Sequence, residues 1–319
     1  MEAATTLWTL TVRASARRWQ RFLHSRSASV LTHGSLVLLT VAEFVLLLRL
    51  PFLLAFVPCA LIHHRIGVLM HEYIHGIPLA RYRHNLWILS LFDGLMLMFG
   101  TLDLFRGTHL AHHRWLNTEN DPAFSAERST RDRKGGAGWL GTLEAVQHLV
   151  YLIEVFQGRH SYVSRSRIIL GAALSAAWAG FLMWIGQSHL IGKILLLTTF
   201  NLVGPVSLRG ALEHHSYRGD SAFANEYRVC IPLFNLNRHV HHHEDPRCPW
   251  YLLQYRTDAP LWTLHYLTHW FHVYVQRDYV LMKPMPPLAA RLCRHARAAR
   301  RPVPHGHTSW RESDHQSSA

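Results

Sequence analysis

The sequence predicts an all-α integral membrane protein, and three observations support this fold class. Hydrophobic residues make up 49% of the 319 residues, and charged residues only 17%. The apolar residues gather in runs of about 20, the length that one helix needs to cross a bilayer. The 26 histidines are clustered, mostly at or beyond the ends of these runs. We therefore expect membrane helices that carry a polar, histidine-rich portion outside the bilayer.

Four apolar runs predict a transmembrane stem made of two helical hairpins. The runs are residues 30–50, 51–70, 168–186 and 190–208. Pro51 marks a tight corner between the first two runs, and Gly186 begins the short turn between the last two. His33 and Glu43 interrupt the first run, and Pro205 is expected to bend the last one. A fifth run, residues 86–105, is long enough to span but carries two aspartates and two internal glycines.

The distribution of arginine and lysine predicts the orientation. The corner and turn inside the two hairpins hold almost none, whereas the start of the chain, residues 114–139 and the part after residue 243 are rich in arginine. By the positive-inside rule, both termini and the large polar segments lie in the cytoplasm. We expect a basic cytosolic segment over residues 1–29, a membrane domain over 30–283, and a basic, disordered tail over 284–319. No cleavage site of a secretory signal peptide follows the first run.

The net charge of +13 fits a nucleic acid, an anionic membrane surface or an acidic partner. The basic residues accompany no nucleic-acid-binding motif, so we expect no nucleic acid and favour the membrane. The four cysteines form no CxxC pair, and we interpret them as reduced and unpaired.

Three histidine boxes have spacings that predict shared metal ligation. Imidazoles three or four residues apart lie on one helical face and can point at one site. The eight histidines in these boxes are His71, His75, His109, His112, His113, His239, His242 and His243. A fourth cluster contributes His214 or His215, of which we favour His214 because it follows Glu213 at the end of an apolar run. Nine ligands are too many for one tetrahedral zinc and suit two metal ions with open positions, for which iron is the usual choice in oxygen chemistry.

A shared metal site also constrains the topology. The first two boxes must meet, so an even number of membrane crossings separates them. Residues 86–105 therefore enter the membrane and return, or lie along its face. Other histidines are interpreted as structural: His33, His148 and His189 as filling space, and His265, His269 and His272 as part of an interfacial helix.

The boxes resemble those of the membrane fatty acid desaturase superfamily over about residues 30–260. The resembling segments are HEYIHG at 71–76, THLAHHRWLNTENDP at 108–122, RGALEHH at 209–215 and NRHVHHHEDPRCPWY at 237–251. The resemblance implies a four-helix transmembrane stem under a cytosolic helical cap that holds a di-iron site. It also implies O2 as co-substrate and no catalytic residues beyond the metal ligands. Asp121, Glu213, Asn237 and Asp245 are candidates for orienting ligand imidazoles, or equally for caps and loop turns.

The implied reaction is O2-dependent desaturation of a lipid or fatty-acyl substrate, whether free or linked to CoA, a carrier protein or a phospholipid. Hydroxylation, ketolation and alkene-forming decarboxylation occur in the same superfamily. A separate donor, such as a ferredoxin, a rubredoxin or a haem protein with its reductase, would supply electrons. The expected location is a bacterial inner membrane, with the active site facing the cytoplasm.

Two other functional classes fit part of the histidine pattern. HEYIH at 71–75 also matches HExxH of zinc proteases, with Glu72 as general base and Asp93 as an acidic third ligand. An intramembrane zinc metalloprotease leaves the second and third boxes unexplained. A metal transporter would place its ligands near the bilayer midplane, whereas these boxes lie at or beyond membrane ends.

Overall fold

The computed structural model describes the stem and most of the histidine boxes. The described residues are 28–79, 81–118, 120–122, 144–206, 209, 213, 215–216, 224, 226–227, 236–253, 261–262 and 280–281. The chain divides into two units, Met1–Met285 and Pro286–Ala319, and every described residue belongs to the first. The predicted disordered tail and residues 1–27 of the predicted amino-terminal segment lie outside the described residues.

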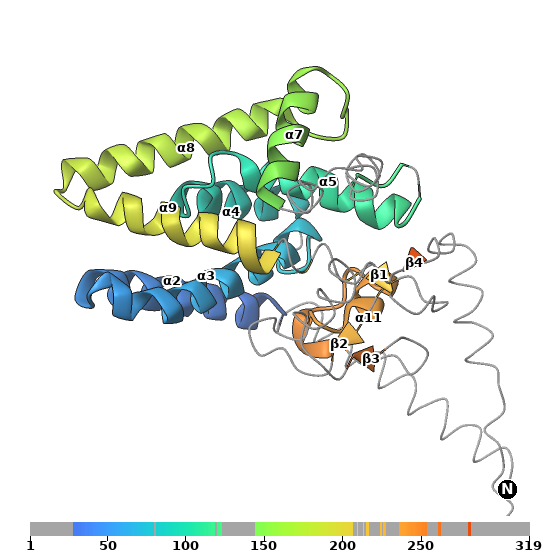
Figure 1. Ribbon diagram of the computed structural model, residues 1–319, viewed down its shortest axis with the longest axis horizontal. Coiled ribbons are helices and arrows are strands. Elements are labelled where there is room, and N and C mark those ends of the chain that lie inside the picture. Colours follow the sequence, from blue (N-terminus) through green and yellow to red (C-terminus); the bar gives the residue numbers. More distant parts are fainter. Residues whose placement is uncertain are drawn as a thin grey trace, which may run out of the picture. The chain divides into compact units, whose positions relative to one another are not determined.

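Four helices in the described part of the chain are long and apolar enough to cross a membrane, as predicted. They are α2 (Ala28–Arg49), α3 (Phe52–Ile74), α8 (Arg165–Trp184) and α9 (His189–Asn201), the last extended by the π-helix η3 (Leu202–Val206). Pro51 separates α2 from α3, and a turn at Gly186, with φ of +74°, separates α8 from α9. Figure 1 shows the two hairpins, with α9 lying between α8 and the first pair. The all-α membrane fold class is confirmed.

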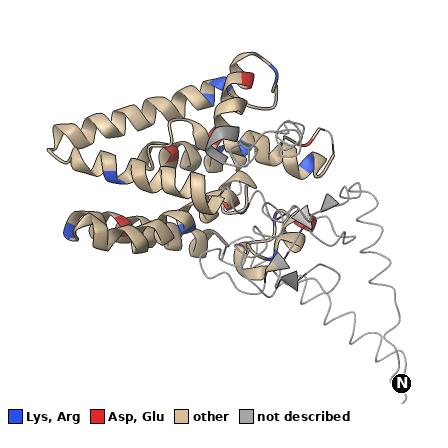
Figure 2. Ribbon diagram, in the orientation of Figure 1, with Lys and Arg blue, Asp and Glu red and all other residues tan. Residues whose placement is uncertain are grey.

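Large apolar side chains on these helices remain exposed, which is what lipid contact requires. Leu53 and Trp184 expose 89% and 82% of their surface, and many other leucines and valines expose more than half. Lys and Arg are sparse over the same helices (Figure 2). A water-soluble protein rarely exposes apolar surface on this scale. Between the hairpins, Leu47, Leu182 and Leu197 form a fully buried core.

The fifth apolar run forms two helices, α4 (Tyr82–Leu95) and α5 (Thr101–Trp115). The break lies at Met96–Gly100, where Leu97, Phe99 and Gly100 have positive φ. The Asp93 carboxylate fixes this corner, since it accepts the backbone N–H of Gly100 at 2.7 Å and of Leu102 at 3.1 Å. A carboxylate at the start of α5 both replaces missing helical hydrogen-bond partners and suits the helix dipole.

The two ends of this run lie at the same level as the histidine boxes. Tyr82 at the start of α4 donates to the Ile74 carbonyl at the end of α3. His109 near the end of α5 contacts His71 of α3. The middle of the run reaches into the stem, where the Met96 carbonyl accepts from Thr198 of α9 at 2.7 Å. The run therefore enters the stem and returns, one of the two predicted arrangements.

Helix α8 holds the corner in place through small residues. The Ser175 hydroxyl accepts the Phe99 N–H and donates to the Asp93 carbonyl. A Cβ at Gly171 would lie 2.9 Å from both Asp93 Oδ2 and Gly100 Cα. Nearby, Arg167 of α8 binds the buried Asp103 of α5 at 2.9 Å.

The remaining described elements are short. Helix α7 (Glu144–Phe156) packs on α5, and α11 (His239–Glu244) carries the third box. The 3-10 turn η5 (Trp250–Leu252) follows it. Two-residue strands form two pairs, β1 (His215–Ser216) with β4 (Val280–Leu281), antiparallel, and β2 (Glu226–Tyr227) with β3 (Leu261–Trp262), parallel.

Candidate metal centre

Five histidines from three helices converge on one point. His71 and His75 lie at the carboxyl end of α3, His109 and His113 one turn apart on α5, and His242 on α11. One ring nitrogen from each lies within 4.8 Å of the corresponding atom of every other. The three boxes are thus brought together, although 129 positions separate His113 from His242.

The contacts among these imidazoles cannot all be hydrogen bonds. His109 Nε2 lies 2.8 Å from His71 Nε2, 3.1 Å from His75 Nε2 and 3.0 Å from His113 Nε2. A ring nitrogen offers either one hydrogen or one lone pair. It can therefore satisfy only one of three such neighbours. Nitrogen lone pairs that converge in this way fit ligands of a shared cation, so the residues present fit a metal ion.

Burial prepares these rings for ligation. The pKa of His113 and that of His242 both lie well below the ordinary value, first because burial disfavours the charged form and then because neighbouring imidazoles repel a second charge. A metal ion binds the neutral imidazole, so these rings need not release a proton near neutral pH.

A second group of histidines adjoins the first. His239 Nε2 and His243 Nε2 are 3.0 Å apart on α11, and the ring of His112 lies 5.2 Å from that of His243. His243 also stacks on His113 of the first group at 4.2 Å between ring centroids. The Glu213 carboxylate lies 3.3 Å from His239 Nε2 and binds Arg209. These three imidazoles and one carboxylate are sufficient donors for a second ion beside the first.

His214 lies outside the described residues. Of His215 the structure describes only the backbone, at the start of β1. The preference for His214 over His215 as ninth ligand therefore stays a prediction.

Asp121 orients one of the histidines. Its carboxylate, which is 1% exposed, accepts from His112 Nδ1 at 2.9 Å and from the Asn117 backbone N–H at 2.8 Å. The bond fixes the proton on Nδ1 and leaves Nε2 with its lone pair, as a metal ligand requires. The trailing Asp of the second box thus has the contact that its predicted role needs.

The other two candidates for orienting imidazoles bind elsewhere. The Asn237 amide donates to the Tyr227 carbonyl, which ties the start of the third box to β2. Asp245 is exposed, and its side chain accepts the Arg247 backbone N–H just after α11. These contacts correspond to the alternative prediction, that such residues serve caps and turns.

Glu72, which the HExxH motif indicates only as the general base of a protease, has a structural role. Its carboxylate accepts from the Thr32 hydroxyl of α2 at 2.5 Å and from the Trp250 backbone N–H at 2.6 Å. It is 3% exposed, and each oxygen has a partner away from the histidine cluster. Glu72 therefore ties the first box to the segment after the third. Its place directly after His71, about 100° round the helix and so off the face of the ligands, was the sequence signal for it.

The histidines predicted to fill space differ in their surroundings. His33 bonds the Ser29 carbonyl at 2.6 Å, and His189 is exposed at the start of α9. His148 instead lines a cavity beside Phe105, whose ring stacks on His109. His265, His269 and His272 lie outside the described residues.

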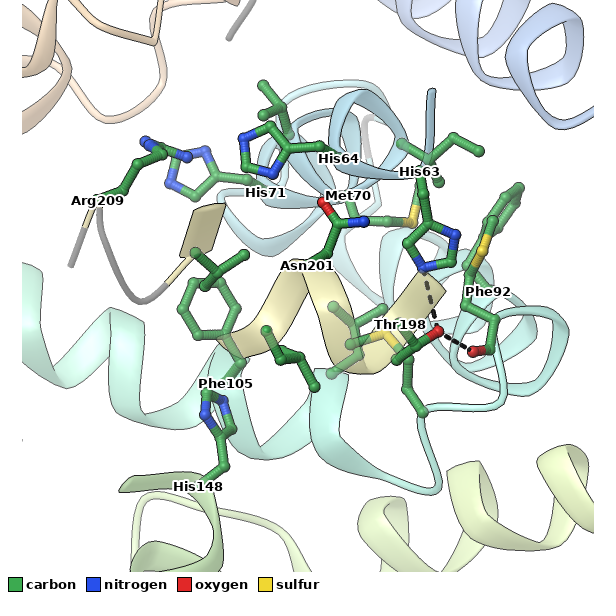
Figure 3. A pocket seen from close by; sticks show the side chains of 18 residues that line it. His63, His64, Met70, His71, Phe92, Phe105, His148, Thr198, Asn201 and Arg209 are labelled. Carbon is green, nitrogen blue, oxygen red and sulfur yellow. Dashed lines mark hydrogen bonds between the residues drawn. The ribbon is translucent and has the colours of Figure 1, made fainter. Parts of the chain in front are cut away.

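The cavity opens beside His71 and extends along α3 into the stem (Figure 3). Its volume is about 110 Å³, far above the roughly 10–15 Å³ that one water needs. Most of its wall is apolar and comes from five helical segments, with Met70, Phe92, Met96, Leu102 and Phe105 among its residues. Such a space suits an alkyl chain lying next to the histidine cluster.

Comparison with known proteins gives one match. The family model described as Fatty acid desaturase matches residues 45–273, more than two thirds of the chain and all three histidine boxes. No curated protein and no solved structure shows a significant match. The matched part holds three of the four candidate spans and the histidine cluster, and the chain belongs to the fatty acid desaturase family.

Proposed function

We propose that the protein is an O2-dependent desaturase of fatty-acyl lipids, with two histidine-ligated iron ions. The observation that carries the proposal is the convergence of His71, His75, His109, His113 and His242 beside an apolar cavity. Family membership implies an oxidoreductase, and the number of histidines exceeds what one metal ion uses.

The two groups of imidazoles divide the ligands between two ions. The five converging rings would hold one ion, and His112, His239 and His243 the other, with His214 or Glu213 completing its shell. When bound, iron supplies the oxidation of an unactivated C–H bond at the expense of O2 and donor electrons. Asp121 holds the proton on His112 Nδ1, and Glu72 joins the first box to the segment after the third through its bond with Trp250.

The cavity walls would position the chain and exclude water. His71 belongs to both the cavity wall and the converging cluster, so a carbon atom in the cavity can approach the metal. The phenyl ring of Phe105 lies between the cavity and His109, where it shields the cluster from water. Electrons would come from a separate ferredoxin, rubredoxin or haem protein, and a basic cytoplasmic face would attract an acidic donor.

Hydroxylation, ketolation or alkene-forming decarboxylation would use the same ligands. The zinc protease alternative has less support, because both Glu72 oxygens are engaged by Thr32 and Trp250 rather than directed at the histidines. The second group of histidines also has no role in a protease with one zinc.

Expression with a compatible electron donor, followed by mass spectrometry of cellular lipids, tests the proposal. Desaturation predicts products lighter by two hydrogens that require O2 and vanish in His109→Ala. Products heavier by one oxygen would identify a hydroxylase instead. Lipids that are unchanged with several donors, in cells where the protein is inserted and loaded with iron, would contradict a lipid oxidase.

A further inference from the structure

Gly67 lies at the centre of the face that α3 turns toward the cavity. The α3 residues that line the cavity extend from His63 to His71, whose imidazoles Figure 3 shows beside it. At 3.6 residues per turn, these two residues lie about 40° on either side of Gly67 around the helix. Along the axis, Gly67 lies midway between them, about 6 Å from His63 inside the stem and about 6 Å from His71 of the converging cluster. A chain that follows this wall to the histidines must therefore pass Gly67.

Gly67 is exposed, although the residues around it on α3 are buried. Its neighbours Ile66 and Val68 are buried, and so are His63 and His71, one turn away in each direction. Apart from its own helical turn, no described atom lies within 4 Å of a Cβ built at Gly67. Its exposed surface belongs to the lining of the cavity. The backbone of α3 is thus bare at this point of the wall, with open space where a side chain would be.

Neither of the usual structural reasons for a glycine applies at Gly67. Its φ angle is not among the positive ones, so its backbone conformation suits any residue. No described segment packs closely against it, in contrast to Gly171, where a Cβ would lie 2.9 Å from Gly100 Cα. Glycine within a helix is also less favourable than alanine. Gly67 therefore leaves room that no described part of the protein fills.

The space beside Gly67 suits an apolar occupant. Three polar side chains of the cavity wall have partners within the protein, in the pairs His63–Glu43, His64–Asn201 and Arg209–Glu213. Most of the remaining wall is hydrophobic, and Met70 of α3 and Leu102 of α5 are buried in it. An alkyl chain fits such a wall, because it needs no hydrogen-bond partner there.

We propose that Gly67 is a substrate-binding residue that admits an alkyl chain to the metal centre. The chain lies against the bare backbone of α3 at Gly67, and the missing side chain is the space that the chain occupies on its way past His71. A larger residue at this position would exclude the chain from the cavity. The inference rests on the proposed function for the statement that this chain is oxidised, but not for the binding of the chain itself.

Substitutions at Gly67 fill the cavity without displacing a described atom. Gly67→Ala adds one methyl group and should lower kcat/KM roughly tenfold or more, the effect of a methyl-sized misfit in an apolar pocket. Gly67→Leu should abolish turnover. Gly192→Leu is the matched control, at a glycine of α9 that is equally open but does not line the cavity, and should keep full turnover. Iron content and survival on heating should be the same in all three variants.

Photo-cross-linking tests the occupancy of the cavity without relying on turnover. Cells that express the full chain are fed a fatty acid with a diazirine in the middle of its chain, which they convert into CoA-, carrier- and phospholipid-linked forms. After illumination, mass spectrometry maps the lipid adducts on the protein. We expect adducts on the buried wall residues Met70 and Met96 in the wild type and in Gly192→Leu, and their loss in Gly67→Leu. Adducts on the exposed Leu53 should persist in every variant.

Full turnover by Gly67→Leu would overturn the inference. So would adducts on Met70 and Met96 that are absent from the wild type or unchanged in Gly67→Leu. If Gly67→Leu fails to insert or loses its iron, Gly67→Ala decides, and full turnover by that variant would contradict the inference. Adducts that depend on Gly67 in a protein without O2-dependent activity would leave the binding site standing without the proposed function. O2-dependent turnover that is indifferent to Gly67 would do the reverse.

Discussion

At the scale of single residues, helical geometry separates the ligands of the third box from their neighbour. His242 and His243 are buried and directed at other imidazoles, whereas His241, between them and His239, is half-buried. The box has four histidines in five positions, so composition alone cannot distinguish them. The spacing of a helix can, because a residue two positions from His239 and one from His242 points away from their shared face.

The first prediction compares these neighbours. His242→Ala should abolish turnover and lower the metal content, because it opens a coordination position. His241→Ala should leave most of both. Metal analysis and lipid turnover of the two variants, at matched expression and membrane insertion, are the measurements. Equal damage from the two substitutions would show that the third box is wrongly assigned.

The second prediction concerns Asp121. Asp121→Asn keeps the shape of the side chain but replaces one acceptor oxygen with a donor, so the proton on His112 Nδ1 is less firmly held. We expect metal affinity to fall on the order of 10–100-fold, measured as retention against a chelator. Asp245→Asn, after the third box, is the matched control and should leave retention unchanged. Similar retention in the two variants would refute the orienting role of Asp121.

At the scale of helices, the packing of α8 on the α4–α5 corner depends on the absence of a side chain at Gly171. The third prediction is that Gly171→Ala destabilises the protein, since its Cβ would lie 2.9 Å from Gly100 Cα. Overpacking of this kind costs about 1–3 kcal/mol. Gly180→Ala on the same helix has no atom within 4 Å of its Cβ and should be neutral or mildly stabilising.

The survival of folded protein after heating in detergent, followed by fluorescence-detected gel filtration, compares these two glycine variants. A Gly171→Ala protein as resistant to heat as Gly180→Ala would show that the corner can yield to the added methyl group.

The fourth prediction concerns the topology of α4 and α5. Both ends of this pair lie at the level of the histidine boxes, so residues 83 and 114 should face the same side of the membrane. Arg83 and Arg114 are exposed, which makes them suitable for cysteine substitution in a cysteine-free background. An impermeant maleimide should label both variants from the same side in oriented vesicles. Labelling from opposite sides would mean that the segment crosses.

The four spans and the meeting of the histidine boxes could be predicted because each depends on local periodicity. The length of an apolar run locates a span, and histidines spaced three or four residues apart locate a helical face. The position of the break within residues 86–105 could not be predicted, because the chain there has the length and hydropathy of a single span. The break depends on Asp93, which binds backbone N–H groups after the corner, and on Gly171, nearly 80 residues further along the chain.

Contacts between distant segments were the least predictable part of the site. Glu72 binds Trp250 across 178 positions, and a lone Glu inside HExxH carries a stronger local signal for a different chemistry. His148 was interpreted as filling space because no other histidine shares its helical face, yet it lies on the cavity wall. By contrast, Asp121 lies only nine positions from His112, within the same motif, so its contact could be anticipated.

At the scale of the whole molecule, the fold brings eight predicted ligands from three distant segments next to an apolar cavity. The stem, the α4–α5 pair and the third box all contribute to this arrangement. The central claim is therefore the metal centre. The eight spaced histidines, with a ninth from the fourth cluster, predict two irons per chain, whereas a protease would need one zinc and a transporter would show variable loading.

The most direct test is the metal content of protein grown with ⁵⁷Fe and purified without chelators, combined with Mössbauer spectroscopy. The account predicts about two irons per chain in nitrogen-rich coordination, lost together in His113→Ala, because the His113 ring of the converging cluster stacks on His243 of the second group. About one zinc per chain and no iron, in a protein whose activity does not require O2, would contradict it.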